Sequence, residues 1–201
     1  SVPYAKMGLI HEWYEIMNKA VEINPEEHLG WRGWYHWFFM HNYQKAIDDI
    51  EALERLVPYD IGQTGDGNYH LNVIKGLCYK GLDQPEKAIQ VIESTISSRD
   101  YVQDGYVMLH LGVLYLELKQ YKKALDLFVN QNNYNPISEV NYYNAICYRN
   151  LGDVEKAIAN LNEALNKYDR QLTMTDSYRQ LPDEIYRSDI TSLLEQYKAE
   201  K

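Results

Sequence analysis

A short run of polar and apolar positions recurs four times along the chain. Each copy places a lysine, an alanine and a branched apolar residue in succession, within residues 43–47, 85–89, 121–125 and 154–158. The alanines of successive copies are 42, 36 and 33 residues apart. Upstream of the last three alanines, at one constant offset, stand Gly76, Gly112 and Ala145, each followed three residues later by Tyr79, Tyr115 and Tyr148. Repetition at a nearly constant spacing predicts a repeat architecture.

The spacing has a direct physical explanation. A small residue on one helix and an alanine on the next let two antiparallel helices approach closely, while large residues three or four places away fill the space beside the contact. The pattern resembles the tetratricopeptide repeat (TPR), a helix–turn–helix unit of 34 residues with small, aromatic and proline positions at these offsets. The best match contains Gly112, Tyr115, Ala124 and Pro136. In overall character the chain is similar to small bacterial TPR proteins.

The resemblance implies an all-α fold, a right-handed α-solenoid of TPR helix–turn–helix units in a single domain over residues 1–201. The expected elements are a partial repeat at 1–26, repeat 1 at 27–60, repeat 2 at 69–102, repeat 3 at 105–137, repeat 4 at 138–171 and a C-terminal capping helix at 182–199. These elements predict at least nine helices, or ten if all of them form.

Two details of the pattern concern how helices begin. In repeat 1 the small-residue place falls on Trp34, whereas Gly33 lies one residue earlier, so the first helix either starts one residue out of register or packs more loosely. After repeat 4, Pro182 and the two acidic residues behind it predict a helix start, because the acids face the positive end of the helix dipole. The apolar stripe from Ile185 to Tyr197 would bury the last open face of the array.

The charge of the chain narrows the class of partner. Lys and Arg number 20 against 29 Asp and Glu, which gives a net charge of −9. Binding to a polyanion depends on Lys and Arg, and the sequence has no basic run, so we expect neither nucleic acid nor a membrane as partner. A polypeptide that is basic or has an apolar segment is favoured. The oligomeric state stays open.

The chain opens without the basic and apolar pattern of a leader segment, which favours a cytoplasmic location. A periplasmic or secreted location stays possible if a signal segment has been removed.

No catalytic or metal-binding constellation is recognisable, so we expect a protein that is not an enzyme and uses no cofactor. The segment at His11 starts like a zinc-protease motif but has Glu15 in place of the second histidine. Cys78 and Cys147 occupy the same place in repeats 2 and 4, too far apart for a disulfide, and are expected to be buried. Residues 60–68 lack the spacing of a calcium loop and predict a long turn.

The resemblance also implies where a partner binds. In TPR domains the first helix of each repeat lines a concave groove, and its fifth and ninth places usually point into it. The candidate residues at or beside these places are Trp31, Tyr35, Phe38, His70, Val73, Leu77, Tyr106, Leu109, Val113, Tyr142, Tyr143 and Ile146. The Lys and Asn residues of the carboxylate clamp, with which some TPR domains hold chaperone tails, are missing here.

An apolar, aromatic groove suits an apolar helix or an extended segment, with tyrosine hydroxyls supplying directional hydrogen bonds. A stripe of aromatic residues at this spacing also fits a packed core. The leading hypothesis is therefore a protein-binding adaptor that captures a polypeptide partner. One alternative is a bacterial immunity or inhibitor protein that neutralises a basic toxin, and another is a carbohydrate-binding accessory protein that stacks Trp and Tyr on sugars.

Overall fold

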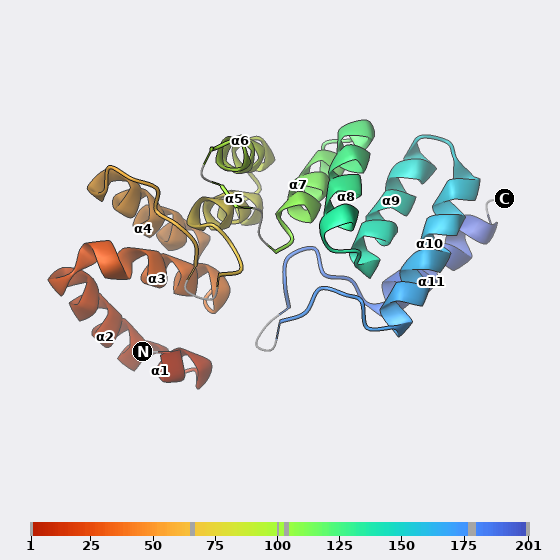
Figure 1. Cartoon of the computed structure of the whole chain (residues 1–201). Helices are drawn as coiled ribbons and strands as arrows, with labels where there is room; N and C mark the ends of the chain where they lie inside the picture. The colour runs from red at the N-terminus through yellow and green to blue at the C-terminus, as the bar shows by residue number, and fades with distance from the viewer. Residues whose placement is uncertain (1, 65–66, 100, 103–104, 177–179, 200–201) are drawn as a thin grey trace. The chain divides into compact units, whose positions relative to one another are not determined.

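The computed structural model describes residues 2–64, 67–99, 101–102, 105–176 and 180–199. Within these residues the regular structure is helical throughout, apart from one isolated antiparallel bridge between Gln63 and His70. This confirms the predicted all-α solenoid fold. Eleven helices are described (Figure 1), where nine or ten were predicted; the additional one is the short α1.

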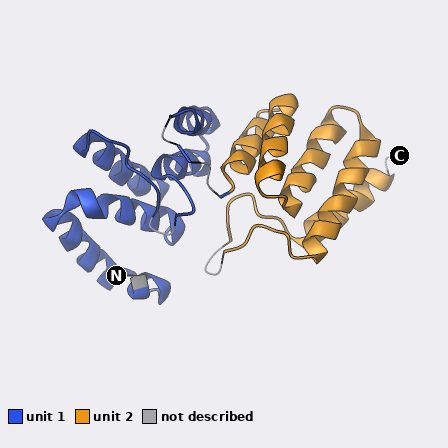
Figure 2. Ribbon diagram, viewed as in Figure 1, with its two compact units in different colours: residues 1–105 blue, residues 106–201 orange. Residues whose placement is uncertain are grey.

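The chain divides into two compact units (Figure 2), residues 1–105 and residues 106–201. Unit 1 contains α1 (Val2–Lys6), α2 (Ile10–Ile23), α3 (Pro25–Phe38), α4 (Tyr43–Leu56), α5 (Leu71–Gly81) and α6 (Pro85–Ile96). Unit 2 contains α7 (Val107–Glu117), α8 (Tyr121–Tyr134), α9 (Ser138–Asn150), α10 (Val154–Asp169) and α11 (Arg187–Ala199). The helix pairs α3–α4, α5–α6, α7–α8 and α9–α10 correspond to repeats 1 to 4. The predicted extent of each repeat, and of a single domain, stays a prediction.

Each helix pair is held together where a small residue meets the second helix. A Cβ added at Gly76 would lie 2.5 Å from Ile92 Cγ1 and 3.2 Å from the backbone oxygen of Ala88. At Gly112 it would lie 2.4 Å from Cε1 of the Phe128 ring. The corresponding residues of the last pair, Ala145 and Ala157, are fully buried. The two helices of a pair are thus close enough to exclude a larger side chain at the first-helix position.

Repeat 1 uses Gly33, not Trp34, at this contact. A Cβ on Gly33 would lie 3.2 Å from Ile50 Cγ1 and 3.3 Å from the backbone oxygen of Ala46, the repeat alanine of α4. Of the two alternatives that the sequence left open, the structure therefore has the shifted register, with the close contact preserved. The shift moves all the remaining positions of α3 by one residue relative to the repeat pattern.

The N-terminal helices extend the array at the start of unit 1. Helix α2 lies within the partial repeat predicted at 1–26 and packs on α3. It contributes Trp13 and Met17 to a buried cluster with Tyr35 of α3 and Ala5 of α1. Asn24 ends α2 and begins α3, where its side-chain oxygen accepts a hydrogen bond from Glu27 N.

The C-terminal helix begins later than predicted. Residues 181–184 form a turn, in which Leu181 N donates to Glu184 Oε2 at 2.9 Å and Asp183 has a left-handed φ of 62°. Helix α11 starts at Arg187, and Tyr186 N donates to Asp189 Oδ2 at 2.7 Å at its start. The proline and acid signal of 182–184 thus marks a turn, because Asp183 bonds to α7 and α9 instead. Helix α11 packs against α10 through Ile190, Leu194 and Tyr197.

The contact between α7 and α8 leads to a testable prediction at Gly112. Gly112→Ala would drive a methyl group into the Phe128 ring, and overpacking of this kind destabilises a core by about 1–3 kcal/mol. Urea unfolding of the variant should show a loss in this range. The control is Phe128→Leu, alone and combined with Gly112→Ala. Because the smaller side chain makes room for the methyl, the double variant should lose less stability than the two single losses added together. Strict additivity would contradict the contact.

Candidate functional site

The predicted candidates in repeat 1 separate into exposed and buried side chains. Trp31 is 37% exposed, whereas Tyr35 and Phe38 are buried. Tyr35 faces Trp13 of α2, with ring centroids 5.2 Å apart. The one-residue shift at Gly33 explains the difference, because it turns Tyr35 toward the preceding helix. In this structure Tyr35 and Phe38 are core residues rather than surface on which a partner could rest.

The candidates on α5 are also buried. Val73 and Leu77 lie in the core. His70 caps the start of α5: its Nδ1 accepts from Asn72 N at 3.0 Å, so its Nε2 carries the proton and lies 3.0 Å from Asp60 Oδ1. The histidine therefore joins the loop after α4 to the start of α5, a structural role. The glycine-rich residues of this loop that are described form the long turn predicted for them.

The candidates of unit 2 are covered by the chain itself. Leu109 and Val113 of α7 are buried, while Tyr106, Tyr142, Tyr143 and Ile146 are half-buried. Tyr142 and Tyr143 pack against the cluster formed by α9, α10 and α11. The Tyr143 hydroxyl donates to the backbone oxygen of Asp183 at 3.1 Å, and a backbone hydrogen bond joins Thr175 to the Tyr106 hydroxyl. Thr175 and Asp183, which follow α10, thus contact the first helices of this unit.

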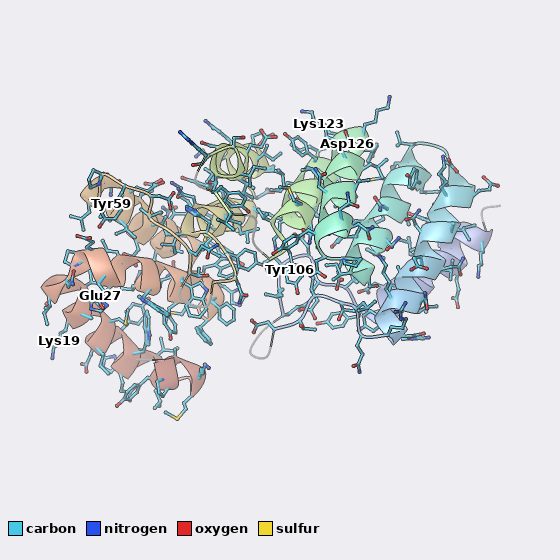
Figure 3. All side chains as sticks on the ribbon, viewed as in Figure 1. Lys19, Glu27, Tyr59, Tyr106, Lys123 and Asp126 are labelled. Carbon is cyan, nitrogen blue, oxygen red and sulfur yellow. The ribbon has the colours of Figure 1, made fainter. Side chains whose placement is uncertain are left out.

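Unit 1 has a hollow beside the start of α3 that the sequence did not predict. Two adjoining cavities of about 430 and 140 Å³ share Glu26, Glu27, Leu53 and Ile61 as lining. The larger one adds Asn24, Val57, Tyr59 and Asp60, and the smaller one adds Gly30, Trp31, Gln63, Thr64 and Leu71. We call these residues the α3 hollow; Glu27 and Tyr59 of this set are labelled in Figure 3.

The α3 hollow combines an apolar floor with an acidic rim. Leu53 and Val57 are buried, whereas Glu26, Glu27 and Asp60 are exposed. The Tyr59 hydroxyl donates a hydrogen bond to Glu26 Oε1, which raises the pKa of the tyrosine. No basic residue lines either cavity among the described residues. The acids behind Pro25 were visible in the sequence, but only the loop after α4 brings Tyr59 and Asp60 beside them.

An aromatic row leads from the hollow along α3. The ring centroids of Trp31 and Trp34 are 6.0 Å apart, and Trp34 stacks on Phe38 at 4.8 Å. Trp34 and Phe39 are half-buried and were missed as candidates, because the repeat pattern read without a gap gave Trp34 the small-residue place. With Gly33 as the small residue, the fifth and ninth places of the first helix fall on Gly30 and Trp34. The sequence had predicted Trp31 and Tyr35 for these two places. Trp31 instead lines the hollow.

The tetratricopeptide repeat family model matches residues 106–129 and 139–170. These residues cover α7 with the first part of α8, and α9 with α10. Unit 2 of the chain therefore contains tetratricopeptide repeats. No curated protein sequence matches it. Among the residues that the structure describes, no group of three or more His, Cys, Asp and Glu could hold a metal ion, and no helix is long and apolar enough to cross a membrane.

Solved structures similar to this TPR protein are themselves repeat proteins. MamA aligns with a TM-score of 0.66 at 16% identity, over 90% of this chain and 93% of that one. YrrB, described as a TPR protein with an unusual peptide-binding site, aligns with a TM-score of 0.63 at 18% identity, over 84% of each chain. TTC0263, a TPR protein of Thermus thermophilus, aligns with a TM-score of 0.56 at 16% identity, over 92% of this chain and 88% of that one. At these identities the similarity establishes the fold.

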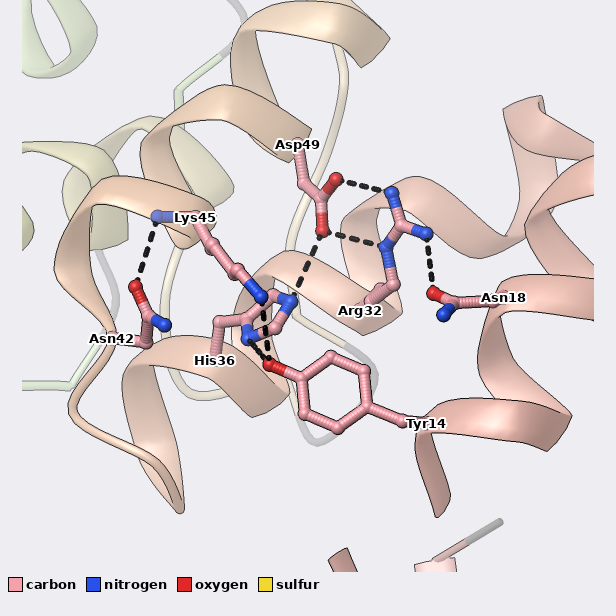
Figure 4. A network of polar contacts seen from close by, with 7 residues as sticks. All are labelled: Tyr14, Asn18, Arg32, His36, Asn42, Lys45 and Asp49. Carbon is pink, nitrogen blue, oxygen red and sulfur yellow. Dashed lines mark hydrogen bonds and ion pairs between the residues drawn. The ribbon is translucent and has the colours of Figure 1, made fainter. Parts of the chain in front are cut away.

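A polar network on the side of α3 facing α2 and α4 fixes these three helices relative to one another (Figure 4). Arg32 donates two hydrogen bonds to Asp49, at 2.9 and 2.6 Å, and a third to Asn18 at 2.9 Å. His36 Nδ1 lies 3.3 Å from the Tyr14 hydroxyl, and its Nε2 lies 3.8 Å from Asp49 Oδ2. Burial, with nearby Arg32 and Lys45, lowers the pKa of His36 to about 4, although Asp49 opposes the shift.

A second buried titratable group lies in unit 2. Glu139 of α9 has no exposed surface, and its Oε1 accepts from Met174 N at 3.1 Å. Burial raises the pKa of Glu139 to about 7, since a buried charge is disfavoured and the carboxylate of Glu184 adds to the effect. The two units thus carry groups whose pKa values are shifted in opposite directions, that of a base downward and that of an acid upward, because burial disfavours the charged form of each.

Neutral His36 makes unit 1 sensitive to acid. The pKa of this histidine is lower in the folded chain than in the unfolded one, so the unfolded chain binds more protons between pH 6.5 and 4. The free energy of unfolding should therefore fall through this window as the pH falls, by on the order of 3 kcal/mol. Unfolding of wild type and His36→Gln, measured across this range, should show the dependence flattened in the variant. His11→Gln, at an exposed position, is the control; a dependence unchanged in His36→Gln would contradict the assignment.

The raised pKa of Glu139 should have the opposite effect. Its pKa is higher in the folded chain than in the unfolded one, so the contribution of this residue to stability falls as the pH rises from 4.5 to 7. Glu139→Gln should remove this contribution, which is on the order of 3 kcal/mol over the window. The measurement is the difference in free energy of unfolding between wild type and variant as a function of pH. Exposed Glu195→Gln serves as the control, and a difference that stays constant with pH would disprove the prediction.

Proposed function

We propose that this TPR protein is a protein-binding adaptor that captures a polypeptide through the α3 hollow of unit 1. Proteins with these repeats are typically non-enzymatic scaffolds that bind polypeptides, and the adaptor role agrees with the fold. The observation that carries the proposal is the pairing of three carboxylates with an exposed tryptophan over an apolar floor.

The chemistry of the hollow suits one basic side chain flanked by apolar ones. A lysine or arginine places its charge among Glu26, Glu27 and Asp60, and its stem or an adjacent apolar side chain rests on Leu53 and Ile61. Trp31 supplies a ring face for a cation or an apolar group. The net charge of −9 increases the rate at which a basic partner arrives.

The groove candidates of the first helices contribute less to this proposal than the sequence indicated. Trp31 is retained as a contact residue, whereas the buried candidates support the scaffold. No specific observation favours an immunity protein over an adaptor, or a carbohydrate ligand over a polypeptide. A cytoplasmic location stays the expectation from the sequence.

A random peptide library displayed on phage and selected on the full chain tests the proposal. Enriched peptides should carry Lys or Arg next to apolar residues. For a resynthesised peptide, Trp31→Ala should weaken binding about thirtyfold, as expected when an interface anchor of about 2 kcal/mol is truncated. Glu27→Gln should reduce the dependence of affinity on salt, because exposed charges are screened.

The matched control is Tyr134→Ala, which removes an aromatic side chain that is 52% exposed on α8 of unit 2. This variant should bind the peptide as the wild type does. All variants are compared by circular dichroism and melting temperature, so that loss of binding is separated from loss of fold. Selected peptides without basic residues, or full affinity in a folded Trp31→Ala variant, would refute the proposal.

A further inference from the structure

We infer that the face of unit 2 formed by α7 and α9 is a second polypeptide-binding surface, and that residues 172–176 and 180–185 occupy it as an exchangeable internal ligand. We call these two stretches the first and second arms. The inference does not depend on the α3 hollow, which lies in the other unit. The ligand on this face is visible in the structure and is a segment of the chain itself (Figure 1).

The first arm binds through its backbone. Ser138 N donates to Leu172 O at 2.8 Å, and Met174 N donates to Glu139 Oε1 at 3.1 Å. Thr175 forms its backbone hydrogen bond with the hydroxyl of Tyr106, labelled in Figure 3. One backbone N–H and the side chains of Glu139 and Tyr106 thus hold an irregular stretch of chain by its peptide groups, while Met174 is buried to 1% exposure. Backbone bonds combined with a buried apolar side chain are the means by which a surface recognises an extended peptide.

The second arm binds through one acidic residue. Asp183 Oδ2 lies 2.7 Å from Nδ1 of His110, a fully buried side chain of α7, and the backbone oxygen of Asp183 accepts from the Tyr143 hydroxyl at 3.1 Å. Leu181 and Ile185 on either side are buried. Asp183 has a left-handed φ of 62°, a conformation that most residues adopt only when surrounding contacts hold it there.

The helices that flank the arms also have contacts that do not involve the arms. Asp169 at the end of α10 forms an ion pair of 2.8 Å with Arg187 at the start of α11, so the ends of the intervening loop are already fixed together. Helix α11 packs on α10 through Ile190, Leu194 and Tyr197 of its own, and Ile185 of the second arm joins the edge of the same cluster. The match to the repeat family ends at residue 170, so the helix pairs of the repeats are complete without the arms. The inference requires that the arms open locally while these helices stay folded.

The contacts define what could replace the arms. A partner would be an extended polypeptide with a carboxylate for His110 and an apolar side chain for the Met174 position. Because the internal ligand is tethered, its effective concentration is in the millimolar range or above, so an external peptide competes only when the arms are weakened or its own affinity is high.

The experiment uses the full chain and a fluorescent peptide of residues 170–187. Asp183→Asn in the chain weakens the second arm, so this variant should bind the peptide at least tenfold more tightly than the wild type does. A peptide carrying the same Asp183→Asn change should bind the variant chain at least tenfold more weakly than the unchanged peptide. Glu195→Gln, which removes an exposed acid from α11, should bind as the wild type does. Equal binding of both peptides, or of the wild-type and Asp183→Asn chains, overturns the inference.

Hydrogen exchange of the wild-type chain gives a second measurement that needs no variant to fold. The amides of the two arms should exchange at least tenfold faster than those in the middle of α7 to α10, because the arms open while the helices stay folded. Equal protection of the arms and these helices would show that they unfold only together. The segment would then be a permanent part of the fold, and the inference would be wrong.

Discussion

The contact between a small residue on one helix and the alanine-bearing face of the next sets how the helices of each repeat pack. At Gly76 and Gly112 the space for a Cβ is already filled by Ile92 and Phe128. Such a contact allows one relative placement of the two helices, because a shift of either one would bring a larger side chain into it. Each repeat is thereby fixed as a hairpin, and its remaining side chains face a neighbouring repeat or solvent.

The same constraint accounts for the surface of unit 1. Since Gly33 supplies the contact with Ala46, α3 is rotated so that Tyr35 joins Trp13 in the core, whereas Trp31 is left at the rim of the α3 hollow. Arg32 and His36 then face α4, where Asp49 meets both of them. The exposure of Trp31 in the proposed binding surface is therefore a consequence of a one-residue change in register, whereas the acidic rim comes from the start of α3 and the loop after α4.

In unit 2 the repeat surface is used differently. Helix α7 is buried on nearly every side, and α9 presents Glu139 and Tyr143 to the segment that follows α10. These contacts combine backbone groups, an acid and a histidine, which is the chemistry expected where a repeat holds a peptide. The two units thus share a repeat architecture while offering chemically different surfaces: the hollow in unit 1 is acidic and open, and the face in unit 2 holds a segment of its own chain.

The helical repeats could be predicted from the sequence, because small residues and alanines at constant offsets describe contacts that lie within one hairpin. The sequence also indicated the acidic character of the chain and the burial of Cys78 and Cys147. The tertiary structure alone decided which aromatic residues are exposed, since this depends on the rotation of α3 and on contacts with the preceding helix. It likewise decided that the signal at 182–184 makes a turn, because His110 and Tyr143, far away in the sequence, bind Asp183. Local patterns predict local contacts, whereas surfaces assembled from distant segments depend on how the helices pack.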